Sequence, residues 1–145
     1  MRILGIDYGR KRIGLAVSDP LCITAQGLPT LERGDLSGHD MDVLAGVIRE
    51  REVDEIVVGL PLNMDGTRGE IAREALAFAG ELRKRFALPV HMMDERLSTV
   101  RAHRAMKEGG LTRKKRAGKV DKISAQLILQ DYLGRKDRRK PGEED

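Results

Sequence analysis

An aspartate stands where an apolar segment meets a glycine-rich turn near the start of the chain. Residues 2–7 read RILGID, residues 8–14 read YGRKRIG, and a second apolar run follows at 15–18. This pattern predicts a hairpin with Asp7 at the turn end of its first strand. Arg10, Lys11 and Arg12 place positive charge beside that carboxylate. A carboxylate that can hold a cation, next to bases that attract phosphate, is what phosphoester chemistry requires.

Other acids occupy positions that a sheet can bring close to Asp7. Asp94 and Glu95 follow an apolar segment, and Asp121 precedes the last apolar helical pattern. Right-handed crossovers would place these acids at one rim of a sheet. Hard divalent cations prefer carboxylate oxygens, and two such ions about 4 Å apart can assist phosphodiester cleavage. The simpler alternatives are a helix N-cap for Asp121 and an ion pair with Arg96 for Asp94 or Glu95.

Hydrophobic periodicity predicts an α/β fold with a mixed sheet and helices on its faces. Strands are expected at 2–7, 13–18, 55–59 and 88–93, with a weaker one at 27–32. Helices are expected at 41–51, 69–86, from Ser98 or Thr99 to 107, and at 121–133, the last capped by Gly134. The charged segment 135–145 is expected to be a disordered tail.

Composition and charge narrow the function classes. The 145 residues suit one domain, and an aromatic content of 3% requires an aliphatic core. The net charge of +4 is concentrated in a basic run at 107–119, which is either a solvated loop or a contact for a polyanion. Three scattered histidines and the lone Cys22 argue against a zinc site and exclude an internal disulfide. Without a signal peptide or a long apolar run, we expect a cytoplasmic protein with no membrane partner.

Four blocks of this sequence together resemble the YqgF family, whose members are also called RuvX-like or Holliday-junction-resolvase-like proteins. The blocks are 7–14, 59–67, 94–99 and 118–121. The resemblance implies a ribonuclease-H-like sheet of order 3-2-1-4-5, with strands 2 and 3 antiparallel to the rest, in a nuclease domain over 1–134. It also implies a bacterial nuclease that processes the 5′ end of pre-16S ribosomal RNA.

The same resemblance assigns roles to residues. Asp7, Glu95 and Asp121 would be the catalytic acids and would hold Mg2+ or Mn2+. The residues that the resemblance and the charge pattern assign to substrate binding are Gly9, Arg10, Lys11, Arg12, Asn63, Thr67, Arg96, Ser98, Arg113, Lys114, Lys115, Arg116 and Lys119.

One feature departs from the wider resolvase pattern. Resolvases hold an acid at the end of the fourth strand, whereas residues 59–61 here read GLP. The second acid must therefore come from the strand beyond, which starts roughly 10 Å from the strand of Asp7. A long glutamate could close part of that gap, and the number of metal ions stays open.

Three other functions are compatible with parts of the pattern. An ATP-binding domain of the actin and sugar-kinase type also uses an aspartate and a glycine-rich hairpin, but it needs a second domain. A non-catalytic nucleic-acid-binding module would use the basic run and gain nothing from Asp7. A Holliday-junction resolvase would act on branched DNA as a dimer. We expect RNA as the substrate and a monomer or weak dimer as the assembly.

Overall fold

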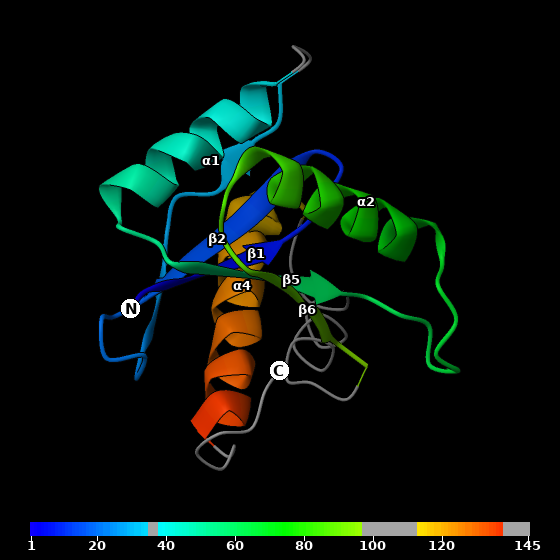
Figure 1. The fold of residues 1–145 in the computed structure, drawn as a ribbon. Coiled ribbons are helices and arrows are strands. Elements are labelled where there is room, and N and C mark those ends of the chain that lie inside the picture. The colour runs from blue at the N-terminus through cyan, green and yellow to red at the C-terminus, as the bar shows by residue number, and fades with distance from the viewer. Residues whose placement is uncertain (35–37, 97–112, 138–145) are drawn as a thin grey trace.

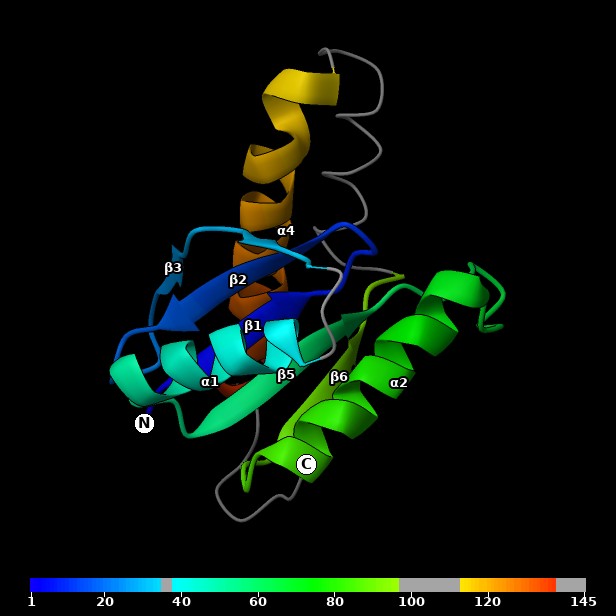
Figure 2. The same cartoon turned by 90° about the horizontal axis from the view of Figure 1, so that it is seen from above.

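A mixed sheet lies at the centre of the computed structural model, with helices on both of its faces (Figures 1 and 2). The structure describes residues 1–34, 38–96 and 113–137, with the backbone alone for 113–121 and for 137. The strands are β1 (Ile3–Asp7), β2 (Arg12–Ser18), β3 (Ala25–Gly27), β4 (Leu31–Glu32), β5 (Glu55–Leu60) and β6 (Val90–Asp94). The helices are α1 (His39–Glu50), α2 (Glu70–Arg85) and α4 (Arg113–Asp137). The expected helix at 98–107 and the tail beyond 137 lie outside the described residues.

The main path of the sheet is β3-β2-β1-β5-β6, which confirms the predicted order, and the short β4 also pairs with β2. β1 and β2 form the predicted antiparallel hairpin, while β5 and β6 run parallel to β1. The predicted directions were wrong for the third strand. β3 is antiparallel to β2 and hence parallel to β1, so β2 alone runs against the other described strands.

The predicted third strand over 27–32 is divided into β3 and β4. Between them lies Pro29, which has no backbone N–H to donate to a neighbouring strand. Leu28 still donates its backbone N–H to the carbonyl of Leu15 before the chain turns away. The chain therefore pairs with β2 twice, once on each side of the proline.

The core is aliphatic, as predicted, and is split by the sheet into two clusters. Alternation along β1 sends Leu4 and Ile6 toward α1 and α2, and Ile3 toward α4. Figure 2 shows α1 and α2 together on one face and α4 crossing the other. α1 and α2 begin and end within a few residues of their predicted limits. No helix in the described part of the chain is long and apolar enough to cross a bilayer.

The last helix is longer than predicted at both ends. It begins at Arg113 instead of near Asp121, because the basic run contains good helix formers and no proline. It continues past Gly134 to Asp137, so Gly134 is not its cap and residues 135–137, expected in the disordered tail, are helical. Near this end, Tyr132 and Lys136 both donate hydrogen bonds to the buried carboxylate of Glu55 at the start of β5. Residues 113–119 of the basic run are thus the start of a helix whose first turns project beyond the sheet (Figure 2).

The absence of a side chain at Gly5, in the middle of β1, lets α4 lie close to the sheet. A Cβ at this position would lie 2.9 Å from Leu129 Cβ and 3.2 Å from the carbonyl oxygen of Ala125. Both neighbours belong to the helix itself, and one is backbone, so they cannot move aside without shifting α4. The close packing of α4 on β1 therefore depends on glycine at this position.

We expect Gly5→Ala to destabilise the fold by about 1–3 kcal/mol, the usual cost of overpacking a well-packed core. Urea unfolding followed by circular dichroism measures this change. The matched control is Gly46→Ala in α1, where a Cβ would meet nothing within 4 Å. Since glycine is unfavourable inside a helix, that variant should gain up to about 1 kcal/mol. Equal stability of Gly5→Ala and the parent would contradict the close packing.

Candidate active site

Asp7 ends β1 and faces the side of the sheet that α4 covers. Its backbone pairs with Gly14 across the hairpin, and its side chain is buried. Ile3 and Gly5 lie on the same face of β1 as Asp7. Ile3 belongs to the core cluster that contains residues of α4, and Gly5 lies against Ala125 and Leu129 of that helix. The hairpin thus aims this carboxylate at the rim beneath α4, as the sequence predicted.

Glu95 follows β6 directly, and its side chain reaches back across the next strand. Its backbone N–H donates to the carbonyl of Leu60 over 3.1 Å, and the residue is only 2% exposed. A Cβ placed on Gly59 would lie 2.6 Å from Glu95 Oε2 and 3.1 Å from its Cδ. The carboxylate therefore lies over β5 and not over its own strand.

This reach brings Glu95 close to Asp7. Ile6 on β1 is paired with Val58 on β5, so the next residues along the two strands, Asp7 and Gly59, are neighbours. Adjacent strands lie about 4.8 Å apart, so the strand that Glu95 follows is roughly 10 Å from the strand of Asp7. Because the Glu95 carboxylate lies over Gly59 on the strand between them, it is only about one strand spacing from the strand of Asp7. The structure brings Asp7 and Glu95 to one rim, on one face.

The backbone of α4 carries residue 121 to the same rim. Tyr132 lies beside Glu55 at the start of β5, and Ile128 lies against Gly59 near its end, so the helix approaches the rim toward its amino terminus. Asp121 stands one turn before Ala125, which packs over Gly5. The side chain of Asp121 lies outside what the structure describes. Among the described side chains there is no cluster of three or more acids, histidines or cysteines suited to a metal ion.

Asp94 has a different partner from Glu95. Its carboxylate accepts hydrogen bonds from Arg96 Nε at 3.0 and 3.3 Å and from the Arg96 backbone N–H at 2.9 Å. Arg96 Nη2 adds an ion pair at 2.9 Å. The side-chain hydrogen bond from Arg96 is the main reason that the pKa of Asp94 is lowered. An ion pair with Arg96 was the simpler alternative for Asp94 or Glu95, and the structure shows that Asp94 forms it.

Asn63 and Thr67, two predicted substrate contacts, lie in a turn just after β5. Asn63 Nδ2 donates to Thr67 Oγ1 over 2.9 Å, and the Thr67 hydroxyl donates to Asp65 over 2.6 Å. The hydrogen bond from the Thr67 side chain is the main reason that the pKa of Asp65 is lowered, and the Thr67 backbone N–H adds to the effect. Both predicted contacts therefore shape the loop. Ser98, assigned to substrate binding with them, lies outside the described residues.

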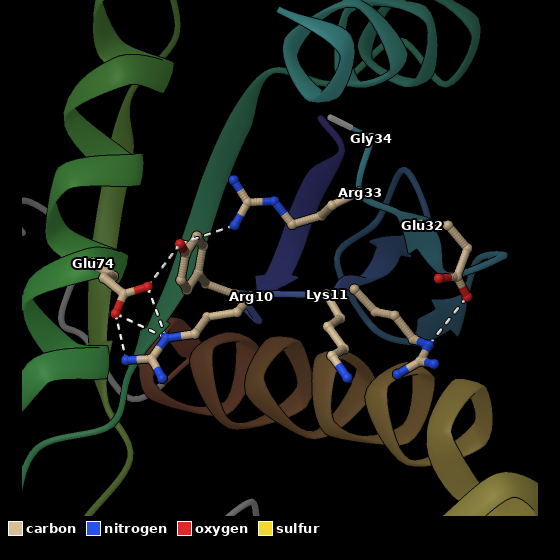
Figure 3. A pocket seen from close by; sticks show the side chains of 8 residues that line it. Arg10, Lys11, Glu32, Arg33, Gly34 and Glu74 are labelled. Carbon is tan, nitrogen blue, oxygen red and sulfur yellow. Dashed lines mark hydrogen bonds and ion pairs between the residues drawn. The ribbon is translucent and has the colours of Figure 1, made fainter. Parts of the chain in front are cut away.

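The basic turn of the hairpin lines a hollow of about 550 Å3 between α2 and β4 (Figure 3). Most of its cations already have acidic partners. Arg10 binds Glu74 over 2.6 Å, and Arg12 binds Glu32 over 3.1 Å. Lys11 is exposed, like Arg10, but no acidic partner for Lys11 is found among the described residues. The arginines predicted to attract phosphate are thus partly neutralised.

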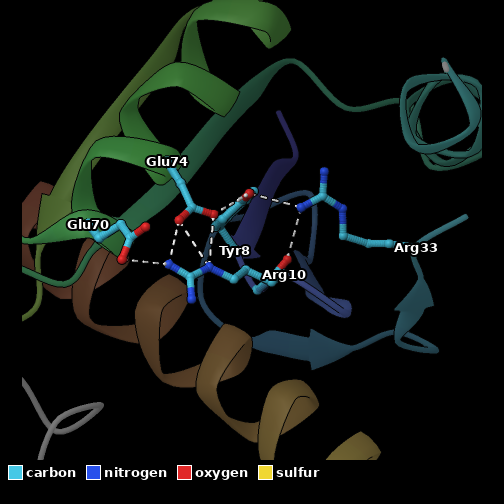
Figure 4. Close-up of polar contacts among 6 residues, drawn as sticks. Tyr8, Arg10, Arg33, Glu70 and Glu74 are labelled. Carbon is cyan, nitrogen blue, oxygen red and sulfur yellow. Dashed lines mark hydrogen bonds and ion pairs between the residues drawn. The ribbon is translucent and has the colours of Figure 1, made fainter. Parts of the chain in front are cut away.

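Tyr8 and Arg33 complete this hollow, and sequence reasoning missed both. Arg33 donates to the Tyr8 hydroxyl over 2.9 Å and to the carbonyl of Gly9 over 3.1 Å (Figure 4). Arg33 also pairs with Asp40 over 2.8 Å. The Tyr8 hydroxyl in turn donates to Glu74 over 3.3 Å. The available signal was alternation, since a tyrosine directly after Asp7 must face the opposite side of the sheet.

Comparisons with known proteins show which family the chain resembles over nearly its whole length. A family model described as "RuvX: Holliday junction resolvase" matches residues 1–135. A relative from Koribacter versatilis is 51% identical over 97% of this chain and 92% of its own, and one from Halothermothrix orenii is 48% identical over 92% and 94%. Both are named "Putative pre-16S rRNA nuclease".

Two solved structures share the fold. The T. thermophilus RuvC complex with a Holliday junction substrate has a TM-score of 0.56 at 15% identity, covering 95% of this chain and 96% of that one. The fowlpox virus Holliday junction resolvase has a TM-score of 0.52 at 13% identity, covering 93% and 99%. At such identities the likeness concerns the fold alone, and it confirms the predicted ribonuclease-H-like class.

We expect the Asp94 carboxyl to titrate below its usual pKa. Arg96→Gln should raise that pKa, because it removes the guanidinium and its hydrogen bonds to the charged carboxylate. Carbon-detected NMR of the carboxyl signals measures both values. Arg10→Gln is the matched control, because it should raise the pKa of Glu74, which Arg10 lowers, and leave Asp94 unchanged. The same Asp94 pKa with and without the Arg96 guanidinium would contradict the ion pair.

Proposed function

The chain belongs to the family described as RuvX: Holliday junction resolvase, and on that basis we propose that it is a divalent-cation-dependent nuclease acting on structured nucleic acid. The observation that carries the proposal is that the Glu95 carboxylate lies over Gly59 on β5, the strand next to the one that Asp7 ends, with residue 121 of α4 at the same rim. The proposed substrate is pre-16S ribosomal RNA, which the names of its relatives support, and the proposed place of cleavage is its 5′ end.

The donor set fits Mg2+ or Mn2+. Asp7 and Glu95 offer carboxylate oxygens, which hard divalent cations prefer, and Mg2+ takes only a few ligands from protein. Asp121 is the third acid proposed to hold the cation. The three proposed ligands include no cysteine or histidine, which would favour a softer metal.

When bound, the cation supplies Lewis-acid stabilisation of the charge that develops on the phosphate. The residues of the chain hold the two carboxylates in position. The end of β1 fixes Asp7, and the backbone hydrogen bond to Leu60 fixes the start of the Glu95 side chain. Both carboxylates are buried, so their oxygens are held in place before substrate arrives. Asp94 stays with Arg96 and takes no part in this set.

Substrate contacts are proposed at two places that flank the acids. Lys11 lies in the turn directly after Asp7, and the projecting turns of α4 carry Arg113, Lys114, Lys115, Arg116 and Lys119 (Figure 2). Positive side chains on both sides of the rim would hold the phosphate backbone across it. Cleavage of branched DNA is the second candidate, favoured by the family description.

We expect cleavage of structured RNA with Mg2+ or Mn2+ and none after chelation. Asp7→Asn and Glu95→Gln should each lower the rate by at least about 100-fold, because each removes a charge that the cation requires. The measurement is a cleavage assay on duplex, single-stranded and branched RNA and DNA.

Asp94→Asn is the matched control for these variants, because it changes an acid next to Glu95 that binds Arg96 instead. A larger loss in Asp94→Asn than in Glu95→Gln would reverse the assignment. Full activity of a folded Asp7→Asn variant would remove Asp7 from the set. Cleavage of branched DNA alone would favour the second candidate.

A second expectation concerns the basic start of α4. Replacing residues 113–116 with alanine should weaken RNA binding and flatten its salt dependence, by up to about 0.9 log–log units for each lost phosphate contact. Alanine keeps the helix, so cation binding should be unchanged. Fluorescence anisotropy at several salt concentrations measures both effects. With an unchanged affinity and slope, the phosphate contacts would have to come from Arg10, Lys11, Arg12 and Arg96.

A further inference from the structure

We infer that Gly59 is a positioning residue: the missing side chain on β5 creates the space in which the Glu95 carboxylate is held beside Asp7. The inference rests on the proposed function of Glu95 as a cation-binding acid. It adds the requirement that residue 59 be glycine, although a glycine has no side chain that could bind a cation or substrate. It also implies that an acidic residue at position 59 would place a carboxylate where that of Glu95 now lies.

The first support is the overlap at this position. A Cβ on Gly59 would lie 2.6 Å from Glu95 Oε2, and atoms that are not bonded do not approach so closely. The same Cβ would lie 2.6 Å from Ile128 Cδ1, the flexible end of a side chain that can turn away. The carboxylate has less freedom, because Glu95 is almost fully buried.

The second support is the way Glu95 is held at its backbone. Its N–H donates to Leu60, the residue after Gly59, and the flanking Asp94 and Arg96 bind each other. The backbone on both sides of Glu95 is therefore fixed, and its side chain extends from a defined point. A new methyl group on residue 59 would have to displace the carboxylate itself.

The third support is the strand register. Gly59 is the neighbour of Asp7 on the adjacent strand, and both face α4. An aspartate at position 59 would carry its oxygens roughly 2.4 Å from its Cβ. That reach is close to the 2.6 Å at which Glu95 Oε2 already lies. An acid on β5 would therefore deliver a carboxylate to the place that Glu95 now fills.

The test has two arms on the full-length chain. In the first, thermal unfolding is measured for the parent, Gly59→Ala, Glu95→Ala and the double variant. Gly59→Ala should lower Tm by at least about 3 °C more in the parent than in the Glu95→Ala background, because only the parent has a carboxylate to displace. The clash with Ile128 is common to both backgrounds and cancels.

The second arm measures Mn2+ binding by calorimetry and cleavage of structured RNA. Gly59→Ala should weaken Mn2+ binding at least tenfold. Gly59→Asp combined with Glu95→Ala should bind Mn2+ at least tenfold more tightly than Glu95→Ala alone, and it should regain cleavage. Gly59→Asn combined with Glu95→Ala is the matched control, since it has the same shape without the charge and should regain neither.

The two proposals fail in different ways. Equal Tm losses in both backgrounds, or equal Mn2+ affinity of the aspartate and asparagine double variants, would overturn the inference about Gly59. If both arms give the expected thermal and Mn2+ results while the parent cleaves no RNA or DNA, the positioning role stands and the nuclease function fails. If Gly59→Ala does not fold, the charge-specific rescue in the second arm decides.

Discussion

The docking of α4 onto the sheet is the contact on which the site depends. It requires glycine at residue 5, because a larger side chain would push against the backbone of Ala125 and the side chain of Leu129. At the far end of the helix, the buried Glu55 holds Tyr132 and Lys136 and fixes how the helix lies along β5. With both points fixed, the amino-terminal turns can extend past the rim only in one direction. The face that α4 covers is also the face on which Asp7 and Glu95 lie.

Alternation along β1 separates two chemically different surfaces by a single residue. Asp7 faces α4 and the proposed cation, whereas Tyr8 faces α2 and joins a network of arginines and acids. In that network Arg10 is held by Glu74 and Arg33 by Asp40, so charge on the α2 side is balanced within the protein. Such balance disfavours phosphate binding by these arginines, which is why the proposed phosphate contacts are Lys11 and the start of α4.

Local patterns in the sequence predicted much of the fold, and tertiary contacts decided the rest. The hairpin, α1, α2 and the buried β5 follow from periodicity and turn residues, and Asp7 could be placed because a strand end and a glycine turn coincide. The start of α4 could not be placed, because a run of lysine and arginine is compatible with a loop or with a helix. The pairing of Arg10 with Glu74 joins residues 64 apart in the chain, and no local signal indicates it. The reach of Glu95 over Gly59 likewise depends on how β5 and β6 pair.

One continuous helix carries both residues 113–119 of the basic run and residue 121. The direction in which each of these residues faces is therefore set by its number of residues from the part of the helix that packs on the sheet. A single residue inserted between 121 and 125 would turn everything upstream by about 100° around the helix axis, and Asp121 would leave the rim. The same insertion before residue 113 would leave that phase untouched. The stretch from 121 to 125 must therefore keep a constant number of residues if residue 121 is to stay at the rim, whereas a change of length upstream of residue 113 leaves the helix phase unchanged.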